Sequence, residues 1–300
     1  MDMLSLMPDT IIRGRWQKRR YIVKGQLGQG GIATVYLVQD VRTKEMFAMK
    51  ISADNISINR EYQLLKNFSN IDMVVRVYEI DDLEIYNRTY YYILLEYIKG
   101  EDLESYFKRR KLDIPTTISI ILIILRGLDK IYAEEYIIGD LKLSNLMLDR
   151  ELGRIRMIDL ASGVKKGQSL KEFTLAYDRA SWNCGDRTAE PSYLLFTVNM
   201  IFIKLLMGES PNPRKYEINA LVKRIKTINL SRELQALIIQ GLSGHYKSFG
   251  PYLAKLKKIY YKERYKQYRD KRNLKNRRVN CFLAFSIFFF IATVVTIYLT

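Results

Sequence analysis

Histidine and cysteine are nearly absent from this sequence. Its 300 residues include one His, His245, and two Cys, Cys184 and Cys281. Two cysteines cannot form a disulfide framework, so we expect a reducing compartment. A single histidine excludes histidine-based metal clusters and removes the commonest general base from most mechanisms.

Proline, glycine and acidic residues are also few. The chain has six Pro and sixteen Gly, and it is 48% hydrophobic and 27% charged, which is typical of a folded protein and excludes extended disorder. Its length suffices for one large domain or for two lobes. The 32 acidic residues are outnumbered by 49 Lys and Arg, and the resulting net charge of +17 indicates anionic partners without bearing on fold.

The surplus positive charge lies mainly in two stretches. One is a basic N-terminal arm over residues 1–20, with cations at Arg13, Arg15, Lys18, Arg19 and Arg20. The other is residues 255–278, where twelve Lys and Arg stand against Glu263 and Asp270 and alternate with tyrosines. Two partners fit this second stretch, an anionic lipid surface and DNA or RNA. Lipid is favoured because the stretch adjoins a long apolar run.

That apolar run closes the chain. Cys281–Leu299 holds nineteen residues without a charge, and at a rise of 1.5 Å per residue it spans roughly 29 Å, about the thickness of the bilayer hydrocarbon. The alternative is a buried core helix. We expect a transmembrane helix over residues 279–299, with the basic flank holding residues 1–278 on the cytoplasmic side of the cell membrane in a single-pass arrangement. Met1–Thr10 has no features of a signal peptide.

Hydrophobic periodicity divides the rest into a β-rich first third and a helical remainder. Strands are expected at Tyr21–Val41, as a hairpin with a glycine-rich bend, and at Met46–Ile51, Val74–Ile80 and Tyr90–Tyr97. Helices are expected at Asn59–Phe68, Leu103–Arg109, Thr116–Glu135 and from Tyr193 through Lys258. The pattern predicts an α+β, bilobal fold with a β-rich N-lobe (21–97) and a helical C-lobe (98–254), joined near Ile98.

Two short strings carry chemistry. Gly139-Asp-Leu-Lys-Leu-Ser-Asn145 places an Asp, a Lys and an Asn at offsets 0, 2 and 5 of one loop, and Ile158-Asp159-Leu160 follows. Asp140 is suited to receive a hydroxyl proton, and Lys142 can neutralise a γ-phosphate. Asn145 and Asp159 offer the hard oxygen ligands that Mg²⁺ prefers. Together they are the parts of a phosphoryl-transfer site.

Earlier motifs strengthen this interpretation. Gly28-x-Gly30-Gly31 lets backbone N–H groups approach a polyphosphate, although a glycine-rich turn alone is weak evidence. Lys50 lies on the strand that follows, where it can point at phosphates, and Glu61 can pair with it from the next helix. Taken alone, a lysine or a glutamate at such a position is more often an ordinary surface charge. All these motifs in this order along the chain are rarely reproduced by chance.

In this order the motifs resemble a bacterial Hanks-type serine/threonine protein kinase. Gly28–Val35 looks like the glycine-rich loop, Ala48-Met49-Lys50 like the strand lysine motif, and Leu95-Glu96-Tyr97-Ile98 like the hinge. More narrowly, Phe173–Trp182 and Thr188–Tyr193 are similar to the YabT-type kinases of spore-forming Firmicutes, which also carry a basic segment and a C-terminal membrane helix.

The resemblance implies ATP, Mg²⁺ and transfer to Ser or Thr hydroxyls of protein substrates. It implies these nucleotide-binding residues: Gly28, Gly30, Gly31, Val35, Ala48, Lys50, Glu61, Glu96 and Ile98. It also implies that Asp140 and Lys142 are catalytic residues and that Asn145 and Asp159 are metal ligands. A kinase regulated by DNA or anionic lipid through its basic segments is the resulting hypothesis.

The chain also departs from the family pattern. Ile138-Gly139 replaces the usual His-Arg, so phosphorylation of Ser169 or Thr174 need not activate through an arginine at that position. Leu194 falls where a buried helix Asp normally organises the catalytic loop. Two alternatives therefore stay open: an ATP-binding pseudokinase scaffold and an atypical small-molecule kinase.

Overall fold

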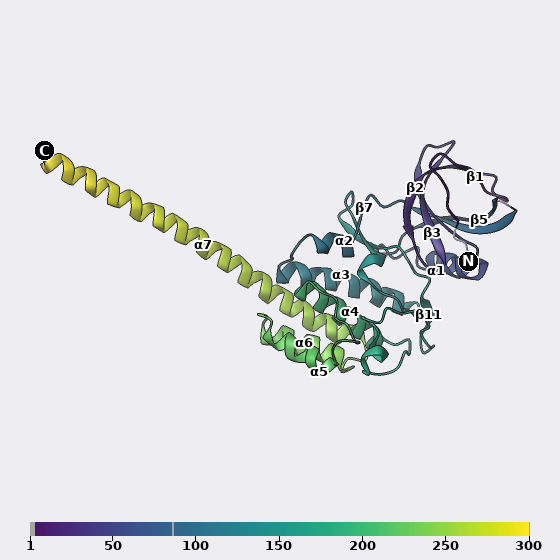
Figure 1. Ribbon diagram of the computed structural model, residues 1–300. Helices are drawn as coiled ribbons and strands as arrows, with labels where there is room; N and C mark the ends of the chain where they lie inside the picture. Colours follow the sequence, from purple (N-terminus) through teal and green to yellow (C-terminus); the bar gives the residue numbers. More distant parts are fainter. Residues whose placement is uncertain (1–3, 86, 300) are drawn as a thin grey trace.

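The chain folds into two lobes from which one long helix projects (Figure 1). The computed structural model describes residues 4–85 and 87–299, except for the side chains of residues 275, 284 and 287–299. The predicted bilobal α+β arrangement is confirmed: strands with one helix form the first lobe, and helices dominate the second.

The N-lobe is built on an antiparallel sheet of six strands in the order β1-β2-β3-β4-β6-β5. The strands are β1 (Ile11–Arg13), β2 (Arg20–Gln29), β3 (Ala33–Asp40), β4 (Met46–Ser52), β5 (Val77–Ile85) and β6 (Arg88–Glu96). Burial alternates along β3, and along β4 up to Ile51, so each strand turns one row of side chains into a core. On β4 that row is Phe47, Met49 and Ile51, which leaves Ala48 and Lys50 on the opposite face.

Helix α1 (Asn55–Asn67) covers the sheet from the other side. Asp54 caps it, because its carboxylate accepts hydrogen bonds from the amides of Ile56 and Ser57. The helix therefore begins at Asn55, four residues before the predicted start at Asn59. Its buried face includes Glu61 together with Ile58, Leu64 and Leu65.

The predicted basic arm is, from residue 4 onward, part of the N-lobe. Strand β1 pairs with β2 in the register Ile12↔Tyr21, and Leu4 and Leu6 pack against the sheet core. The amides of Trp16 and Gln17 donate to the carboxylate of Asp81. These contacts join residues far apart in sequence, so local composition could not indicate them.

The C-lobe holds the remaining helices and two small sheets. Its helices are α2 (Leu103–Lys108), α3 (Ile114–Ala133), α4 (Pro191–Met207), α5 (Ile218–Thr227), α6 (Arg232–Leu242) and α7 (Phe249–Leu299), with short 3₁₀ turns η1 (Leu143–Asn145) and η2 (Arg179–Trp182). Strands β7 (Gly100–Asp102), β9 (Leu146–Asp149) and β10 (Arg154–Met157) form one sheet, and β8 (Tyr136–Ile138) pairs with β11 (Gly163–Lys165).

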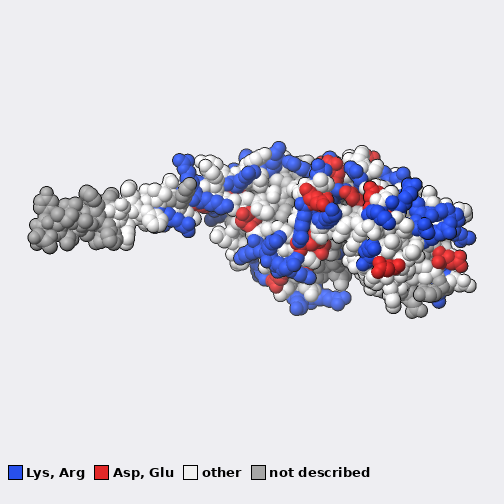
Figure 2. Space-filling view, turned by 90° about the horizontal axis from the view of Figure 1, so that it is seen from above, with Lys and Arg blue, Asp and Glu red and all other residues white. Residues whose placement is uncertain are grey.

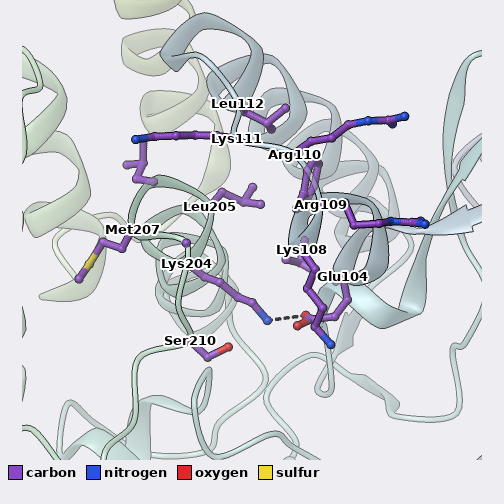
Figure 3. A pocket seen from close by; sticks show the side chains of 14 residues that line it. Glu104, Lys108, Arg109, Arg110, Lys111, Leu112, Lys204, Leu205, Met207 and Ser210 are labelled. Atoms are coloured by element: carbon purple, nitrogen blue, oxygen red, sulfur yellow. Dashed lines mark hydrogen bonds and ion pairs between the residues drawn. The ribbon is translucent and has the colours of Figure 1, made fainter.

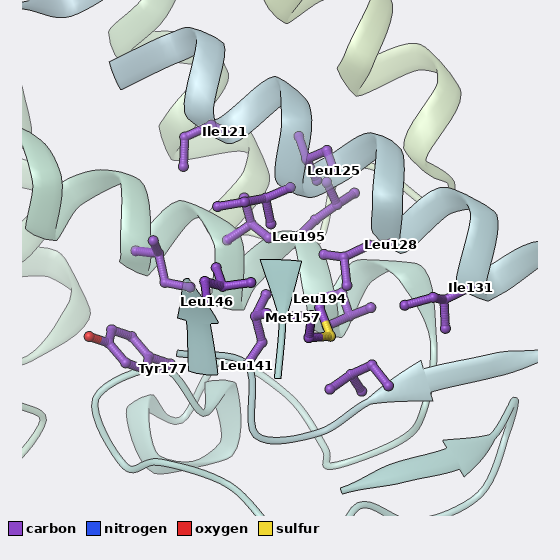
Figure 4. Packing of buried hydrophobic residues seen from close by; sticks show 14 of the residues in the cluster. Ile121, Leu125, Leu128, Ile131, Leu141, Leu146, Met157, Tyr177, Leu194 and Leu195 are labelled. Atoms are coloured by element: carbon purple, nitrogen blue, oxygen red, sulfur yellow. The ribbon is translucent and has the colours of Figure 1, made fainter. Parts of the chain in front are cut away.

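Leucine and isoleucine fill the C-lobe core beneath these strands (Figure 4). Thirteen consecutive residues of α4, from Pro191 to Ile203, are buried. A helix buried on all sides is expected to be apolar around its whole circumference, and this stretch is, apart from the buried polar residues Ser192, Thr197 and Asn199. This core carries the loop 139–145, because Leu141 and Leu143 are both buried in it.

Helix α7 begins inside the C-lobe and continues out of it. Tyr252, Leu256 and Ile259 are buried and Glu263 is nearly so, hence the helix belongs to the lobe beyond the predicted boundary at residue 254. Lys and Arg side chains then gather along the part that leaves the lobe (Figure 2).

Within the described part of the chain, no helical stretch combines the length and the apolar composition needed to cross a bilayer. The predicted span 279–299 falls largely outside that part, since the side chains of residues 284 and 287–299 are not described. The membrane helix stays a prediction.

Candidate active site

The strand register aligns the predicted nucleotide-binding residues across the N-lobe sheet. Gly28 of β2 pairs with Val35 of β3, and Val35 pairs with Lys50 of β4. Since directly paired residues of an antiparallel sheet point to the same face, Val35 and Lys50 lie side by side on the face away from the sheet core. Ala48 lies two residues from Lys50 and shares that face.

The glycines of the β2–β3 turn are not required by the protein itself. A Cβ built on Gly28 or Gly31 would meet nothing within 4 Å, and one on Gly30 only the carbonyl oxygen of Ala33 at 3.6 Å. None of the three has a positive φ. Neither crowding nor backbone conformation demands glycine here, so the open space above the turn fits a ligand that approaches the backbone closely.

Lys50 is held between two carboxylates. Its Nζ lies 2.7 Å from Glu61 Oε2 and 3.4 Å from Asp159 Oδ1. Burial alone would lower the pKa of Lys50, but the charges of Glu61 and Asp159 outweigh it and raise that pKa, so the ammonium stays protonated. The Glu61 side chain is 1% exposed, and burial raises its pKa while Lys50 opposes the shift. The predicted Lys–Glu pair is present.

The segment predicted as the hinge leaves β6 at the junction of the lobes. Ile98 is buried. The carboxylate of Glu96 turns to Arg156, with Oε2 2.6 Å from Nη2 and Oε1 3.2 Å from Nη1. The Glu96 side chain is thus committed to a structural ion pair, and its backbone amide donates to the carbonyl oxygen of Arg76 at 2.9 Å.

The loop 139–145 brings the predicted catalytic residues together. Lys142 Nζ lies 2.5 Å from Asp140 Oδ2, and the Thr174 hydroxyl donates to Asp140 Oδ1 at 2.6 Å. The Asp140 amide donates to the Ser162 hydroxyl at 2.9 Å. Each oxygen of Asp140 is therefore oriented by one neighbour, while its backbone is held by another.

Asn145 and Asp159, the residues predicted as metal ligands, lie close to each other and to Asp140. The side-chain nitrogen Nδ2 of Asn145 donates to the Asp140 backbone carbonyl at 3.1 Å. The side-chain oxygen of Asn145 is thus left for a cation. The Asn145 carbonyl accepts from the Ile158 amide at 3.0 Å and brings Asp159 alongside. Asp159 is 38% exposed. A carboxylate and an amide oxygen next to a phosphate cradle form a donor set that fits Mg²⁺.

Sequence reasoning missed Thr174 and Ser162 as parts of this site. Thr174 was considered only as a phosphorylation site, yet its hydroxyl contacts Asp140 across a separation of 34 residues. Ser162 lies 22 residues from Asp140. No local pattern marks either contact, because only the tertiary fold places the segment 162–174 over the catalytic loop.

The two departures from the family pattern are accommodated by close packing. A Cβ on Gly139 would lie 2.7 Å from the Glu172 carbonyl oxygen and 3.0 Å from Leu170 Cδ2. Glycine thus lets the segment 170–172 pass directly over the catalytic loop. Leu194 is fully buried and belongs to the same apolar cluster as Leu141 (Figure 4).

Asp178 organises the segment that follows Thr174. Its carboxylate is fully buried and accepts hydrogen bonds from Arg187, Ser181 and Tyr193. Burial alone would raise the pKa of Asp178, but these hydrogen bonds outweigh it and hold the pKa below its ordinary value. An ionised, fully bonded carboxylate fixes this segment to α4.

Comparisons with known proteins agree with this geometry. The protein kinase domain family matches residues 21–258. The chain is 33% identical to the serine/threonine-protein kinase YabT of Bacillus subtilis over 250 residues, which cover 81% of this chain and 72% of that protein. It is 28% identical to the serine/threonine-protein kinase PrkC of the same organism over 72% of this chain, which amounts to 34% of PrkC. The human cAMP-dependent protein kinase catalytic subunit PRKX is 27% identical over 46% of the chain and 40% of its own length.

Proposed function

This chain belongs to the protein kinase domain family and is a serine/threonine protein kinase, and on that premise we propose that Asp140 accepts the proton of the acceptor hydroxyl. The observation that carries this proposal is the joint orientation of the two Asp140 oxygens by Lys142 and Thr174. A carboxylate held from both sides keeps one geometry while a hydroxyl approaches it.

The chain's own residues divide the transfer step between them. As the acceptor oxygen bonds to the γ-phosphorus, the bond from that phosphorus to the β–γ bridging oxygen breaks, and the hydroxyl proton passes to Asp140. Lys142 adds positive charge where the transferred group carries negative charge. Thr174 holds the second carboxylate oxygen and so keeps the first one directed at the acceptor.

Binding of the nucleotide rests on the aligned face of the N-lobe sheet. When bound, Mg²⁺ATP supplies the phosphoryl group and the metal charge that stabilises its transfer. The residues assigned to its phosphates, base and metal are Gly28, Gly30, Gly31, Val35, Ala48, Lys50, the main chain of Glu96 and Ile98, Asn145 and Asp159. Glu61 acts through Lys50, which it orients.

Transfer of radiolabel from γ-labelled ATP tests these roles. Wild type is compared with Asp140→Asn on a generic protein substrate, and nucleotide binding is measured in parallel. We expect the variant to bind nucleotide normally and to transfer phosphate at least a hundredfold more slowly. Equal rates would remove Asp140 from the mechanism, and transfer only to small molecules would replace the protein substrate.

The chain is further proposed to be anchored in the cell membrane by residues 279–299, with the kinase lobes on the cytoplasmic side. The uncharged run and its basic flank support this arrangement. Residues 255–278 would then lie at the membrane surface and bind anionic lipid. Exposed tyrosines on one helical side, Tyr261, Tyr265 and Tyr268, suit an interface between water and lipid. DNA is the second candidate for this segment.

Flotation with liposomes tests the anchor and its partner. The full chain and a chain truncated after residue 278 are mixed with neutral liposomes, with liposomes containing anionic lipid, or with duplex DNA. We expect the full chain to float with both kinds of liposome. The truncated chain should bind only the anionic liposomes, and only at low salt. Phosphate transfer measured in each mixture shows whether lipid or DNA regulates the enzyme. Recovery of the full chain free of liposomes would contradict anchoring.

A further inference from the structure

A second hollow lies beside the catalytic loop, away from the face assigned to the nucleotide. It has a volume of about 650 Å³ and lies between α2 and the C-terminal end of α4 (Figure 3). Its walls come from the end of α2 with the loop after it, from Leu143 at the start of η1, and from the last turn of α4. We call it the α2–α4 pocket.

Positive charge dominates the α2–α4 pocket. Four consecutive cations, Lys108, Arg109, Arg110 and Lys111, line it together with Lys204, and the only carboxylate in its lining is Glu104. Glu104 is already paired with Lys204, and the dashed line in Figure 3 marks this contact.

Two of these cations are engaged elsewhere and two are not. Arg109 pairs with Glu101, and the Arg110 guanidinium lies 4.3 Å from the centre of the Tyr106 ring. Lys108 and Lys111 are exposed, and neither has an ion pair or hydrogen bond from its ammonium to any described residue. In the view of Figure 3, Lys111 extends over the end of α4, whereas Arg109 and Arg110 point to the opposite side.

Apolar side chains make up most of the rest of the pocket's lining. Phe107, Leu112, Leu143, Leu205 and Met207 line it below the cations. Single-stranded nucleic acid is usually bound on several aromatic platforms, and this pocket has only one aromatic side chain. A concave surface lined by cations and apolar side chains fits instead a polypeptide segment that carries both carboxylates and apolar side chains.

The pocket is continuous with the segments that hold the acceptor site. Leu143 directly follows Lys142 and lies three residues from Asp140. Lys204 Nζ also lies 3.2 Å from the hydroxyl of Tyr177, which is three residues beyond Thr174. An extended polypeptide spans about 3.3 Å per residue, so a substrate whose hydroxyl reaches Asp140 carries its neighbouring residues past this pocket.

We propose that the α2–α4 pocket binds an acidic segment of the protein substrate, in which carboxylates a few residues from the acceptor Ser or Thr contact Lys108 and Lys111. This inference rests on the proposed function, because Asp140 must receive the acceptor from the same polypeptide. The pocket thereby selects among substrates, because its cations would repel Lys or Arg residues beside the acceptor Ser or Thr.

Three peptides test the proposal with the full chain. They share one acceptor Ser and differ only in flanking residues, which are Glu, Ala or Lys. The pocket variant is Lys108→Glu with Lys111→Glu. The matched control is Lys223→Glu with Lys226→Glu, a pair with the same spacing on the exposed side of α5.

For wild type we expect kcat/KM for the Glu peptide to exceed that for the Ala peptide roughly tenfold, the sum of two exposed charge contacts. The pocket variant should lose this preference and favour the Lys peptide, while the control keeps the wild-type order. Equal rates for all three peptides, or an equal loss in both variants, would overturn the pocket assignment.

Fluorescence anisotropy of labelled peptide separates this inference from the proposed function. If binding of the Glu peptide weakens only in the pocket variant, the pocket assignment is supported even when no phosphate is transferred. A lack of phosphate transfer would count against the proposed function alone. Normal transfer without preference would count against the pocket alone. A labelled oligonucleotide that loses binding in the pocket variant, with peptide kinetics unchanged, would replace the acidic segment by nucleic acid.

Discussion

The two halves of the active site are held in place by different forces. The nucleotide half depends on charge, because Lys50 is fixed between Glu61 and Asp159 in a largely buried position. The loop of the acceptor half depends on packing: Leu141 is buried in the core that contains Leu194. A charge network tolerates little chemical change, whereas a packed loop tolerates different residues that fill the same space.

This difference bears on how the chain accommodates its departures from the family pattern. The charged groups of the nucleotide half are all present, although Ala33 and Ala161 stand there where the family usually has glycine. Two further replacements, Gly139 and Leu194, lie in the acceptor half. There the segment 170–172 takes the space above Gly139. Thr174, whose hydroxyl is engaged by Asp140, is a poor position for an activating phosphate, because a phosphate would place like charge beside that carboxylate.

The largest effect is expected from removing charge in the nucleotide half. Glu61→Gln keeps the shape but leaves Lys50 with only Asp159 as an anionic neighbour. Misplacement of the Lys50 ammonium should lower phosphate transfer roughly a hundredfold and raise the KM for ATP more than that for peptide. Glu233→Gln, which breaks the exposed pair with Lys262, is the control and should change neither constant. A Glu61→Gln enzyme with normal kinetics would contradict the charge-based account.

A smaller effect is expected from the hydrogen bond that orients Asp140. Thr174→Val removes the hydroxyl and keeps the shape, whereas Thr174→Ser keeps the hydroxyl. Loss of one hydrogen bond to a charged group corresponds to about 1.5–3 kcal/mol, hence a decrease in kcat of roughly tenfold or more for the Val variant. The Ser variant should stay near wild type. Steady-state kinetics on one peptide decide the matter, and equal activity of the Val and Ser variants would exclude this role.

The absence of a side chain at Gly139 offers a test of packing in the acceptor half. In Gly139→Ala the added methyl meets the Glu172 backbone, so the segment above the loop must shift. We expect the free energy of unfolding to fall by about 1–3 kcal/mol, with peptide phosphorylation reduced a few-fold and the KM for ATP unchanged. Gly25→Ala is the control, because its Cβ meets nothing within 4 Å. Unfolding in urea, with both variants side by side, measures the difference.

Much of this fold and site was predictable because its signals are local. The hairpin of β2 and β3 follows from alternating β-branched residues and a glycine-rich bend, and the spacing of Asp140, Lys142 and Asn145 within one loop is visible in the sequence. Predictions of this kind rest on residues that lie near one another in the sequence.

The features that were missed depend on distant contacts. The amides of Trp16 and Gln17 hold the N-terminal segment to Asp81 across 65 and 64 residues, and the contact between Thr174 and Asp140 forms across 34 residues. Gly139 could be read in the sequence as a missing arginine, but only the structure shows that the Glu172 backbone occupies the adjoining space. Local patterns identify which groups are present, and tertiary packing decides which of them meet.

The smallest effect concerns pH and the acceptor half. In the segment after Thr174, Asp178 is a buried carboxylate that accepts hydrogen bonds from Arg187, Ser181 and Tyr193. The pKa of Asp178 is lowered in the folded protein, so its ionisation stabilises the fold at pH values above its unfolded pKa of about 3.9, and this contribution is lost as the pH falls through the folded pKa. Wild type should therefore be more stable than Asp178→Asn at pH 7, and the difference should shrink below about pH 4. Asp186→Asn, at an exposed neighbouring position, serves as control. Trp182, buried beside Asp178 in η2, reports unfolding by its fluorescence, and a stability difference that persisted unchanged at pH 3 would show that packing rather than charge gives Asp178 its role.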